Sequence, residues 1–212
     1  MIKRIIFDLD RTLIPWLPEW DLMVEETYNY FNISYENIGF EKFQNSLHEY
    51  EKCHRRFDKI EMSKYFREHL DRRIPDDFVE VWTNYLSDCV PDKDDKLISL
   101  LEYLSSKYSL VIATNWFKDQ QMAKLEKFGI LKYFDFILSC DEYDKKPNSE
   151  MFRIACKGFD KDEVVMVGDT YKTDIKSAMD FGLYSYYLTD SDVRKSKRFK
   201  IINSIYELDK YL

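Results

Sequence analysis

The sequence is poor in the residues that mark several protein classes. It has 4 cysteines, 5 glycines and 5 prolines in 212 residues, and no two cysteines form a C-x-x-C pair. A disulfide framework or a zinc site is therefore not expected. Cys53, Cys89, Cys140 and Cys156 are predicted to be free thiols of a protein in the reducing cytoplasm.

Long apolar runs and an excess of positive charge are also missing. The longest apolar runs, residues 110–113 and 164–167, are far shorter than the roughly 18 residues needed to span a bilayer. A carboxylate, Asp8, comes too early for a signal peptide. The 32 Lys and Arg against 39 Asp and Glu give a net charge of −7, which disfavours nucleic acid and anionic membranes as partners. The oligomeric state stays open.

What is present is an alternation of short buried strands and amphipathic helices. Apolar runs rich in β-branched or aromatic residues predict strands at residues 2–7, 110–113, 136–138, 164–167 and 184–188. Between several of them lie helical faces: Leu97, Leu100, Leu101 and Leu104; Met122, Leu125 and Phe128 before Gly129; Ile175, Ala178 and Met179 before Gly182. Strands that alternate with helices predict a parallel sheet covered on both faces.

Residues 15–91 differ from the rest of the chain. Aromatic residues recur there in helical rhythm, as in Trp20, Val24 and Tyr28, and no strand pattern is visible. We therefore expect an all-helical insertion after the first strand. Near the other end, the basic stretch 194–200 is expected to be a solvated loop.

Polar motifs follow several of the predicted strands. In parallel sheets, ligands bind at the carboxyl ends of the strands, which is where these motifs would lie. Asp8, Asp10 and Thr12 follow the first strand. Two carboxylates so close together tolerate each other when a cation lies between them or when they share a proton. An ordinary turn is the alternative. Thr114 and Asn115 follow the strand at 110–113, and they would either cradle an oxyanion or cap a helix.

Two further motifs complete the set. Lys146 precedes Pro147 at a predicted helix start, with Asn148 or Ser149 as its N-cap. This lysine would offer a point charge to a phosphate, unless it lies on the surface. Asp169 and Asp174 follow the strand at 164–167 and are typical ligands of Mg²⁺, although Asp174 would also serve as a helix cap.

The order of these four motifs resembles that of the haloacid dehalogenase-like hydrolase superfamily, whose members are mostly phosphatases. The resemblance implies an α/β fold, a Rossmann-like doubly wound parallel sheet core with an inserted all-helical cap domain. The catalytic core would comprise residues 1–14 and 92–212, and the cap residues 15–91. Substrate choice would come from the cap, where His54, Arg55 and Arg56 either meet a second anionic group or form a solvated charged face.

The resemblance also implies catalytic roles. Asp8 would be the nucleophile that forms an aspartyl-phosphate, and Asp10 would be the general acid and then the base. Thr12 would orient Asp8, while Thr114 and the backbone N–H of Asn115 would hold phosphoryl oxygens. Lys146 would neutralise charge beside them; we prefer it to Lys145 because it adjoins Pro147.

The cofactor implied by the resemblance is Mg²⁺. Asp8, Asp169 and the main-chain carbonyl of Asp10 would bind the ion directly, and Asp174 would bind through water or support the other ligands. The charges of these residues also favour a bound cation. Four carboxylates against Lys146 leave a net charge of about −3, and phosphoryl transfer requires this negative charge to be cancelled.

The predicted function is a Mg²⁺-dependent phosphatase, a phosphoric monoester hydrolase that acts on a small phosphorylated metabolite. A phosphomutase of the same fold and a non-catalytic phosphometabolite-binding module are the alternatives. The first motif keeps Asp10, which haloacid dehalogenases lack, and this favours phosphate chemistry. Arg11 and Trp116 depart from the small residues common at their positions. Arg11 would point to solvent or add charge at the mouth, and Trp116 would narrow the pocket.

Overall fold

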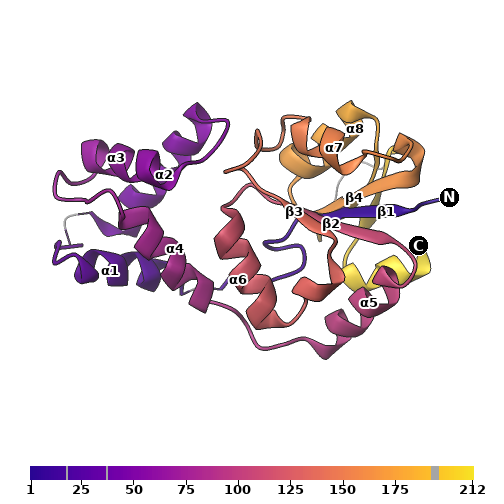
Figure 1. The fold of residues 1–212 in the computed structure, drawn as a ribbon, viewed down its shortest axis with the longest axis horizontal. Helices are drawn as coiled ribbons and strands as arrows, with labels where there is room; N and C mark the ends of the chain where they lie inside the picture. Colours follow the sequence, from indigo (N-terminus) through magenta and orange to yellow (C-terminus); the bar gives the residue numbers. More distant parts are fainter. Residues whose placement is uncertain (18, 37, 192–195) are drawn as a thin grey trace.

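The computed structural model describes residues 1–17, 19–36, 38–191 and 196–212. Within these residues, six strands form one parallel sheet in the order β3-β2-β1-β4-β5-β6 (Figure 1). Their bounds are Arg4–Phe7 (β1), Ser109–Ala113 (β2), Phe136–Leu138 (β3), Val164–Gly168 (β4), Tyr184–Leu188 (β5) and Phe199–Ile202 (β6). The chain runs outward from β1 to β3 and then returns to place β4 on the other side of β1. The strand order therefore reverses between β1 and β4, and such a switch point forms a ligand site at the carboxyl ends of the strands.

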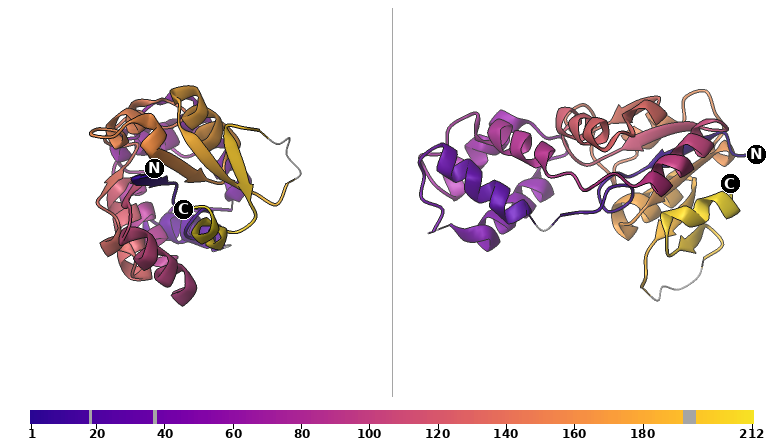
Figure 2. Two further views of the ribbon diagram at one scale, coloured as in Figure 1. Left: turned by 90° about the vertical axis from the view of Figure 1, so that its right-hand side faces the viewer. Right: turned by 90° about the horizontal axis from the view of Figure 1, so that it is seen from below.

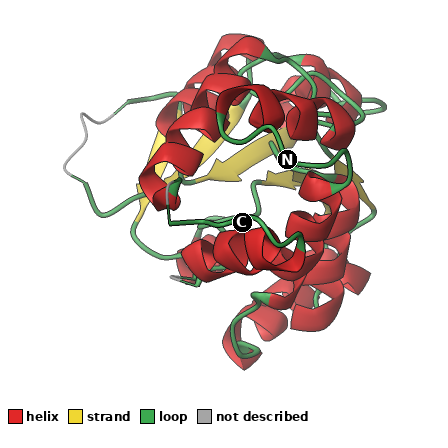
Figure 3. Ribbon diagram, turned by 90° about the vertical axis from the view of Figure 1, so that its left-hand side faces the viewer, coloured by secondary structure: helices red, strands yellow, loops and turns green. Residues whose placement is uncertain are grey.

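Both faces of the sheet are covered, as predicted (Figure 3). Alternate residues of β1 enter different cores: Ile5 and Phe7 belong to one, and Ile6 to the other. The first core is closed by α5 (Asp95–Ser105), α6 (Lys118–Phe128) and the 3₁₀ helix η4 (Ile205–Lys210), and the second by α7 (Glu150–Ala155) and α8 (Ser177–Phe181). This is the doubly wound architecture expected from the sequence.

A helical segment lies to one side of the sheet, between β1 and α5 in the chain. It consists of α1 (Trp20–Tyr30), α2 (Gly39–Cys53), α3 (Lys59–His69) and α4 (Phe78–Asp88). Figure 2 shows these helices at one end of an elongated molecule and both termini at the other. The aromatic residues that recur in helical rhythm pack on one another: the rings of Trp20 and Phe43 each pack edge-on against that of the fully buried Trp82, at 5.0 Å between centroids.

Several local predictions are confirmed. Gly129 ends α6 and Gly182 ends α8, both in the left-handed conformation, with φ of 85° and 103°. Ser149 is the N-cap of α7, although its side chain makes no capping hydrogen bond. The preceding Asn148 accepts a hydrogen bond from the backbone N–H of Glu150 at 2.9 Å. The four cysteines are free. No helix in the described part of the chain is long and apolar enough to cross a membrane.

Two local predictions are wrong. Met122 is 39% exposed, whereas Gln121 and Lys124 of the same helix are buried, so α6 turns a partly polar face inward. The expected loop at 194–200 is corrected at its end, because residues 199 and 200 begin β6; residues 194 and 195 lie outside the described residues. The buried Phe199 and Ile202 anchor this strand beside β5.

Candidate active site

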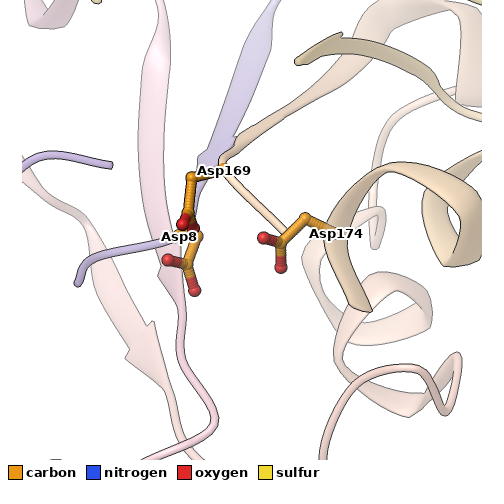
Figure 4. Close-up of side chains that lie close together, drawn as sticks. All are labelled: Asp8, Asp169 and Asp174. Atoms are coloured by element: carbon orange, nitrogen blue, oxygen red, sulfur yellow. The ribbon is translucent and has the colours of Figure 1, made fainter. Parts of the chain in front are cut away.

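Three carboxylates converge where the strand order reverses. Asp8 directly follows β1 and donates its backbone N–H to the carbonyl of Val167 in β4 at 2.9 Å. Asp169 directly follows β4, and Asp174 lies five residues further on. One oxygen from each of these three aspartates lies within 4.8 Å of the other two, and Figure 4 shows the side chains gathered beside one another.

Asp174 reaches this cluster because the chain after β4 folds back on itself. The turn η3 (Tyr171–Lys176) is a π-helix, a wide helical form that often occurs at functional sites. The backbone N–H of Thr170 donates to Asp174 Oδ2 at 3.0 Å. Gly168 permits this close approach, because a Cβ at that position would lie 2.6 Å from the Cβ of Asp174.

Of the two adjacent lysines, Lys146 lies inside the cluster, whereas Lys145 points to backbone carbonyls at the end of α2. The side chain of Lys146 is 1% exposed, and its Nζ donates to Asp8 Oδ1 at 2.7 Å and to Asp174 Oδ1 at 2.6 Å. Asn115 fixes the backbone of Lys146 from across the site, through two hydrogen bonds of 2.8 Å between its side-chain amide and the N–H and carbonyl of Lys146. This contact of the Asn115 side chain is not visible in the sequence, where only its backbone N–H was expected to act.

The charges of the cluster are not balanced by its own residues. Burial raises the pKa of Asp8 to about 7, against the attraction of Lys146. Burial also raises the pKa of Asp169, and the charge of Asp174 adds to this effect. Burial alone would lower the pKa of Lys146, but Asp174 and Asp8 outweigh it and raise that pKa. Three carboxylates that share one ammonium group have the oxygen donors and the charge that suit a hard divalent cation.

Thr12 and Thr114 border the cluster in different ways. The hydroxyl of Thr12 donates to Asp8 Oδ2 at 3.3 Å. Thr114 follows β2, is 2% exposed, and lines the same cleft as Asp8 and Asn115.

Asp10 is not among the clustered aspartates. Its carboxylate accepts hydrogen bonds from Gln121 Nε2 at 2.6 Å and from Lys124 Nζ. The sequence reasoning missed both α6 residues, because it searched that helix for apolar periodicity alone. In the sequence, polar residues at 120, 121 and 124 interrupt the apolar face of this helix, and the structure buries all three beside Leu125 and Phe128.

A cleft of about 1100 Å³ lies over this site and is lined by the core and by the helical segment. Trp116 lines it and packs edge-on against Trp82, at 5.6 Å between ring centroids. The side chain of Arg11 is exposed at the mouth, with its guanidinium 5.9 Å from the centroid of the Trp16 ring. Arg56 instead forms ion pairs with core residues Asp144 and Glu150.

Comparisons with known proteins agree with this geometry. Residues 5–187 match the model of a family described as haloacid dehalogenase-like hydrolase. The chain is 28% identical to ribulose-1,5-bisphosphate 5-phosphatase of Halopiger xanaduensis, over 91% of this chain and 87% of that protein. It is also 28% identical to glyceraldehyde 3-phosphate phosphatase of Methanocaldococcus jannaschii, over 86% and 83% of the two chains.

The fold is shared with solved structures. The magnesium-bound HAD hydrolase YfnB of Bacillus subtilis superimposes with a TM-score of 0.78, at 19% identity, over 100% of this chain and 98% of that one. This similarity supports the architecture described above.

Proposed function

The chain belongs to the haloacid dehalogenase-like hydrolase family and is a phosphoric monoester hydrolase, and we propose that it hydrolyses a small phosphomonoester through an aspartyl-phosphate on Asp8. The observation that carries this proposal is the convergence of Asp8, Asp169, Asp174 and Lys146 at the switch point of the sheet. This arrangement supports the proposal, because the carboxylate that would attack phosphorus lies beside the carboxylates that would hold a cation and in contact with a fixed positive charge.

The proposed reaction has two steps. In the first, an oxygen of Asp8 attacks phosphorus, the bond to the leaving oxygen breaks with its electron pair, and that oxygen takes a proton from Asp10. In the second, a water molecule attacks the aspartyl-phosphate and gives its proton to Asp10. Inorganic phosphate and the Asp8 carboxylate are then released, and Asp10 is again protonated.

The phosphoryl oxygens would be held by fixed donors. Thr114 would donate its hydroxyl, Asn115 its backbone N–H, and Lys146 would face the charge that shifts between Asp8 and the phosphate. Thr12 would keep the attacking oxygen of Asp8 oriented. All four residues are supplied by loops at the ends of neighbouring parallel strands, so their positions depend on the rigid sheet.

The metal of this proposal is Mg²⁺. Asp8, Asp169 and the main-chain carbonyl of Asp10 would hold it, and Asp174, which also accepts from Lys146, would complete or support the ligand set. The bound ion would supply the positive charge that the buried carboxylates lack.

The proposed substrate is a small phosphorylated metabolite of the cytoplasm. As their names say, the two relatives reported above are phosphatases of ribulose-1,5-bisphosphate and of glyceraldehyde 3-phosphate. A cleft of about 1100 Å³ accommodates esters of that size. The helical segment would be the cap, residues 15–91, which covers the cleft and excludes water. The limits of this cap remain a prediction.

Replacing Asp8 by Asn tests the proposal. Wild-type protein with Mg²⁺ is expected to release inorganic phosphate from p-nitrophenyl phosphate and from members of a metabolite-phosphate panel. Asp8→Asn should lose this turnover by about 10⁴-fold or more, because an amide is not a nucleophile for phosphorus. Free phosphate and sugar-phosphate isomers are measured together. Isomer formation without phosphate release would indicate a mutase, and binding without turnover would indicate a non-catalytic module; either result overturns the proposal.

A further inference from the structure

Both carboxylate oxygens of Asp10 are engaged by one helix. Gln121 Nε2 donates to Oδ2 at 2.6 Å, and Lys124 Nζ donates to Oδ1. The two α6 residues are three positions apart, so they project from the same side of the helix. Gln121 is fully buried and Lys124 is 6% exposed. Burial of a lysine and a glutamine on this face indicates a specific polar contact, because such groups are rarely buried without one.

The same Gln121 amide also binds Thr114. Its Nε2 lies 2.9 Å from Thr114 Oγ1. An NH₂ group has two protons to donate and accepts none, so the oxygen of Thr114 must be the acceptor. The opposite orientation of the amide would place its oxygen against the Asp10 carboxylate, which is unfavourable. The hydroxyl proton of Thr114 therefore points away from Gln121, and no acceptor for it is found among the described residues.

We propose that Gln121 and Lys124 are positioning residues for phosphoryl transfer, an inference that rests on the function proposed above. Gln121 links the proton-transfer group, Asp10, to a phosphoryl-binding hydroxyl, Thr114, through one rigid amide. Lys124 supplies the charge that faces Asp10 when it loses its proton. Neither residue touches the substrate, and each acts through a group that does.

The contribution of Lys124 arises in the transition state. As the leaving oxygen takes the proton of Asp10, negative charge develops on that carboxylate, next to a fixed and almost fully buried ammonium group. Interactions of this kind are stronger at a buried site than in water. Lys146 does not serve this purpose, because it binds Asp8 and Asp174.

The dependence of the rate on the leaving group tests this role. An alkyl phosphate needs its leaving oxygen protonated, whereas p-nitrophenyl phosphate releases a far more acidic alcohol and needs no proton. Lys124→Met is expected to lower kcat for the alkyl ester by about 100-fold, the size of a general-acid contribution. The loss for p-nitrophenyl phosphate should stay below about tenfold. A residue with a merely structural role would lower both rates by the same factor, and that result would overturn the proposal.

Two further variants serve as controls for Lys124→Met. Lys124→Arg keeps the charge and should recover most of the alkyl-phosphate activity. Lys127→Met removes a lysine from the same helix that pairs with the exposed Asp88, and it should leave both rates unchanged. Thermal melting establishes that each variant is folded. If Lys124→Arg shows no recovery while folded, a role for the charge is rejected.

Gln121→Leu tests the link to Thr114. With the amide gone, the Thr114 hydroxyl is free to turn away from the phosphoryl site, so inorganic phosphate should inhibit the variant several-fold less strongly than it inhibits wild type. The alkyl ester should again lose more rate than p-nitrophenyl phosphate. Unchanged phosphate inhibition contradicts the inference for Gln121. An inactive wild-type protein would instead refute the proposed function itself.

Discussion

At the scale of single residues, the site depends on a glycine, Gly168, as much as on its charged residues. Gly168 ends β4, and the space where a Cβ would stand is filled by Asp174: the nearest atoms, Cβ and Oδ2, lie 2.6 Å from the ideal Cβ position. Contacts under 3.0 Å force something to move. Asp174 would have to leave the backbone N–H of Thr170 and the Nζ of Lys146.

Gly168→Ala is therefore expected to weaken Mg²⁺ binding by about tenfold or more and to lower the free energy of unfolding by about 1–3 kcal/mol. Calorimetric titration with Mg²⁺ and urea unfolding measure the two effects. Gly158→Ala is the matched control, because that glycine has a φ of 84° and no neighbour within 4 Å of a built Cβ. It should lose stability alone. Equal Mg²⁺ affinity in Gly168→Ala and wild type would show that Asp174 is not needed at the metal site.

The positions of site residues were predictable where residue chemistry and place in the chain agree. Asp8, Asp169 and Asp174 follow strands that a buried apolar pattern identifies, and the parallel sheet brings them together. Gln121 and Lys124 were not predictable by the same means. Their burial depends on a partner, Asp10, that lies more than 100 positions away in the chain, and local periodicity carries no information about that contact.

At the scale of elements, α5 illustrates how a helix start is tied to the rest of the fold. Asp94 is its N-cap, and Oδ1 accepts from the backbone N–H groups of Lys96 at 2.9 Å and Leu97 at 3.0 Å. The other oxygen accepts the hydroxyl of Tyr206 in η4. The Tyr206 hydrogen bond, with the two backbone bonds, holds the pKa of Asp94 below its ordinary value of 3.8. One carboxylate therefore fixes both a helix end and a contact between two elements.

Asp94→Ala is expected to lower the free energy of unfolding by about 1–2 kcal/mol at neutral pH. The carboxylate is favoured in the folded state, so its contribution is present above the unfolded-state pKa and is lost as pH falls through the lower folded-state pKa. The difference between variant and wild type should thus shrink below pH 3.8. Urea unfolding across this range measures it, with Asp95→Ala, the adjacent exposed aspartate, as control. A difference that stays constant with pH would show that the charge of Asp94 plays no part.

Helices and strands were predictable where the apolar residues of the element alone identify its buried face. The central strands and the aromatic helices of the insertion bury faces that the sequence displays. The inward face of α6 includes polar residues that bind Asp10 and Thr114, so an apolar search misassigned Met122. β6 was missed because its four residues are held by the neighbouring β5 and by Phe199 in a small outer cluster, both of which are tertiary effects.

At the scale of the whole molecule, a loop of the helical segment contacts the core beside the active site, in addition to the contacts of α4 with α6 and Trp116. The loop between α2 and α3, residues 54–58, forms backbone hydrogen bonds with the core segment 140–145. Phe57 donates its N–H to the carbonyl of Cys140 at 2.8 Å, and Lys145 donates its N–H to that of Arg55 at 2.8 Å. We call this contact the loop bridge.

Adjacent lysines connect the loop bridge to the active site. Lys146 directs its Nζ into the aspartate cluster, whereas Lys145 directs its Nζ to the carbonyls of Glu51 and His54 at the end of α2. A cation at this end of a helix also suits the helix dipole. Because α2 lines the cleft, any movement of the helical segment away from the core strains the backbone that carries Lys146.

Replacing Arg56 would weaken the loop bridge without changing a residue of the active site. Arg56 forms ion pairs with Asp144 at 3.0 Å and Glu150 at 3.1 Å, and it is half exposed. Exposed ion pairs contribute little to folding because solvent screens them, so Arg56→Met should scarcely change global stability. Amide exchange at residues 54–58 should nevertheless accelerate several-fold, because local opening needs less free energy than unfolding.

High salt should produce the same acceleration in wild type by screening these ion pairs. Arg73→Met is the matched control, since Arg73 pairs with Asp71 inside the helical segment, and it should leave exchange at 54–58 unchanged. Substrate KM would rise in Arg56→Met if the loop bridge holds α2 over the cleft, while the Mg²⁺ requirement would stay as in wild type. Exchange and KM that both match wild type would show that the Arg56 ion pairs do not help to hold the loop bridge to the core.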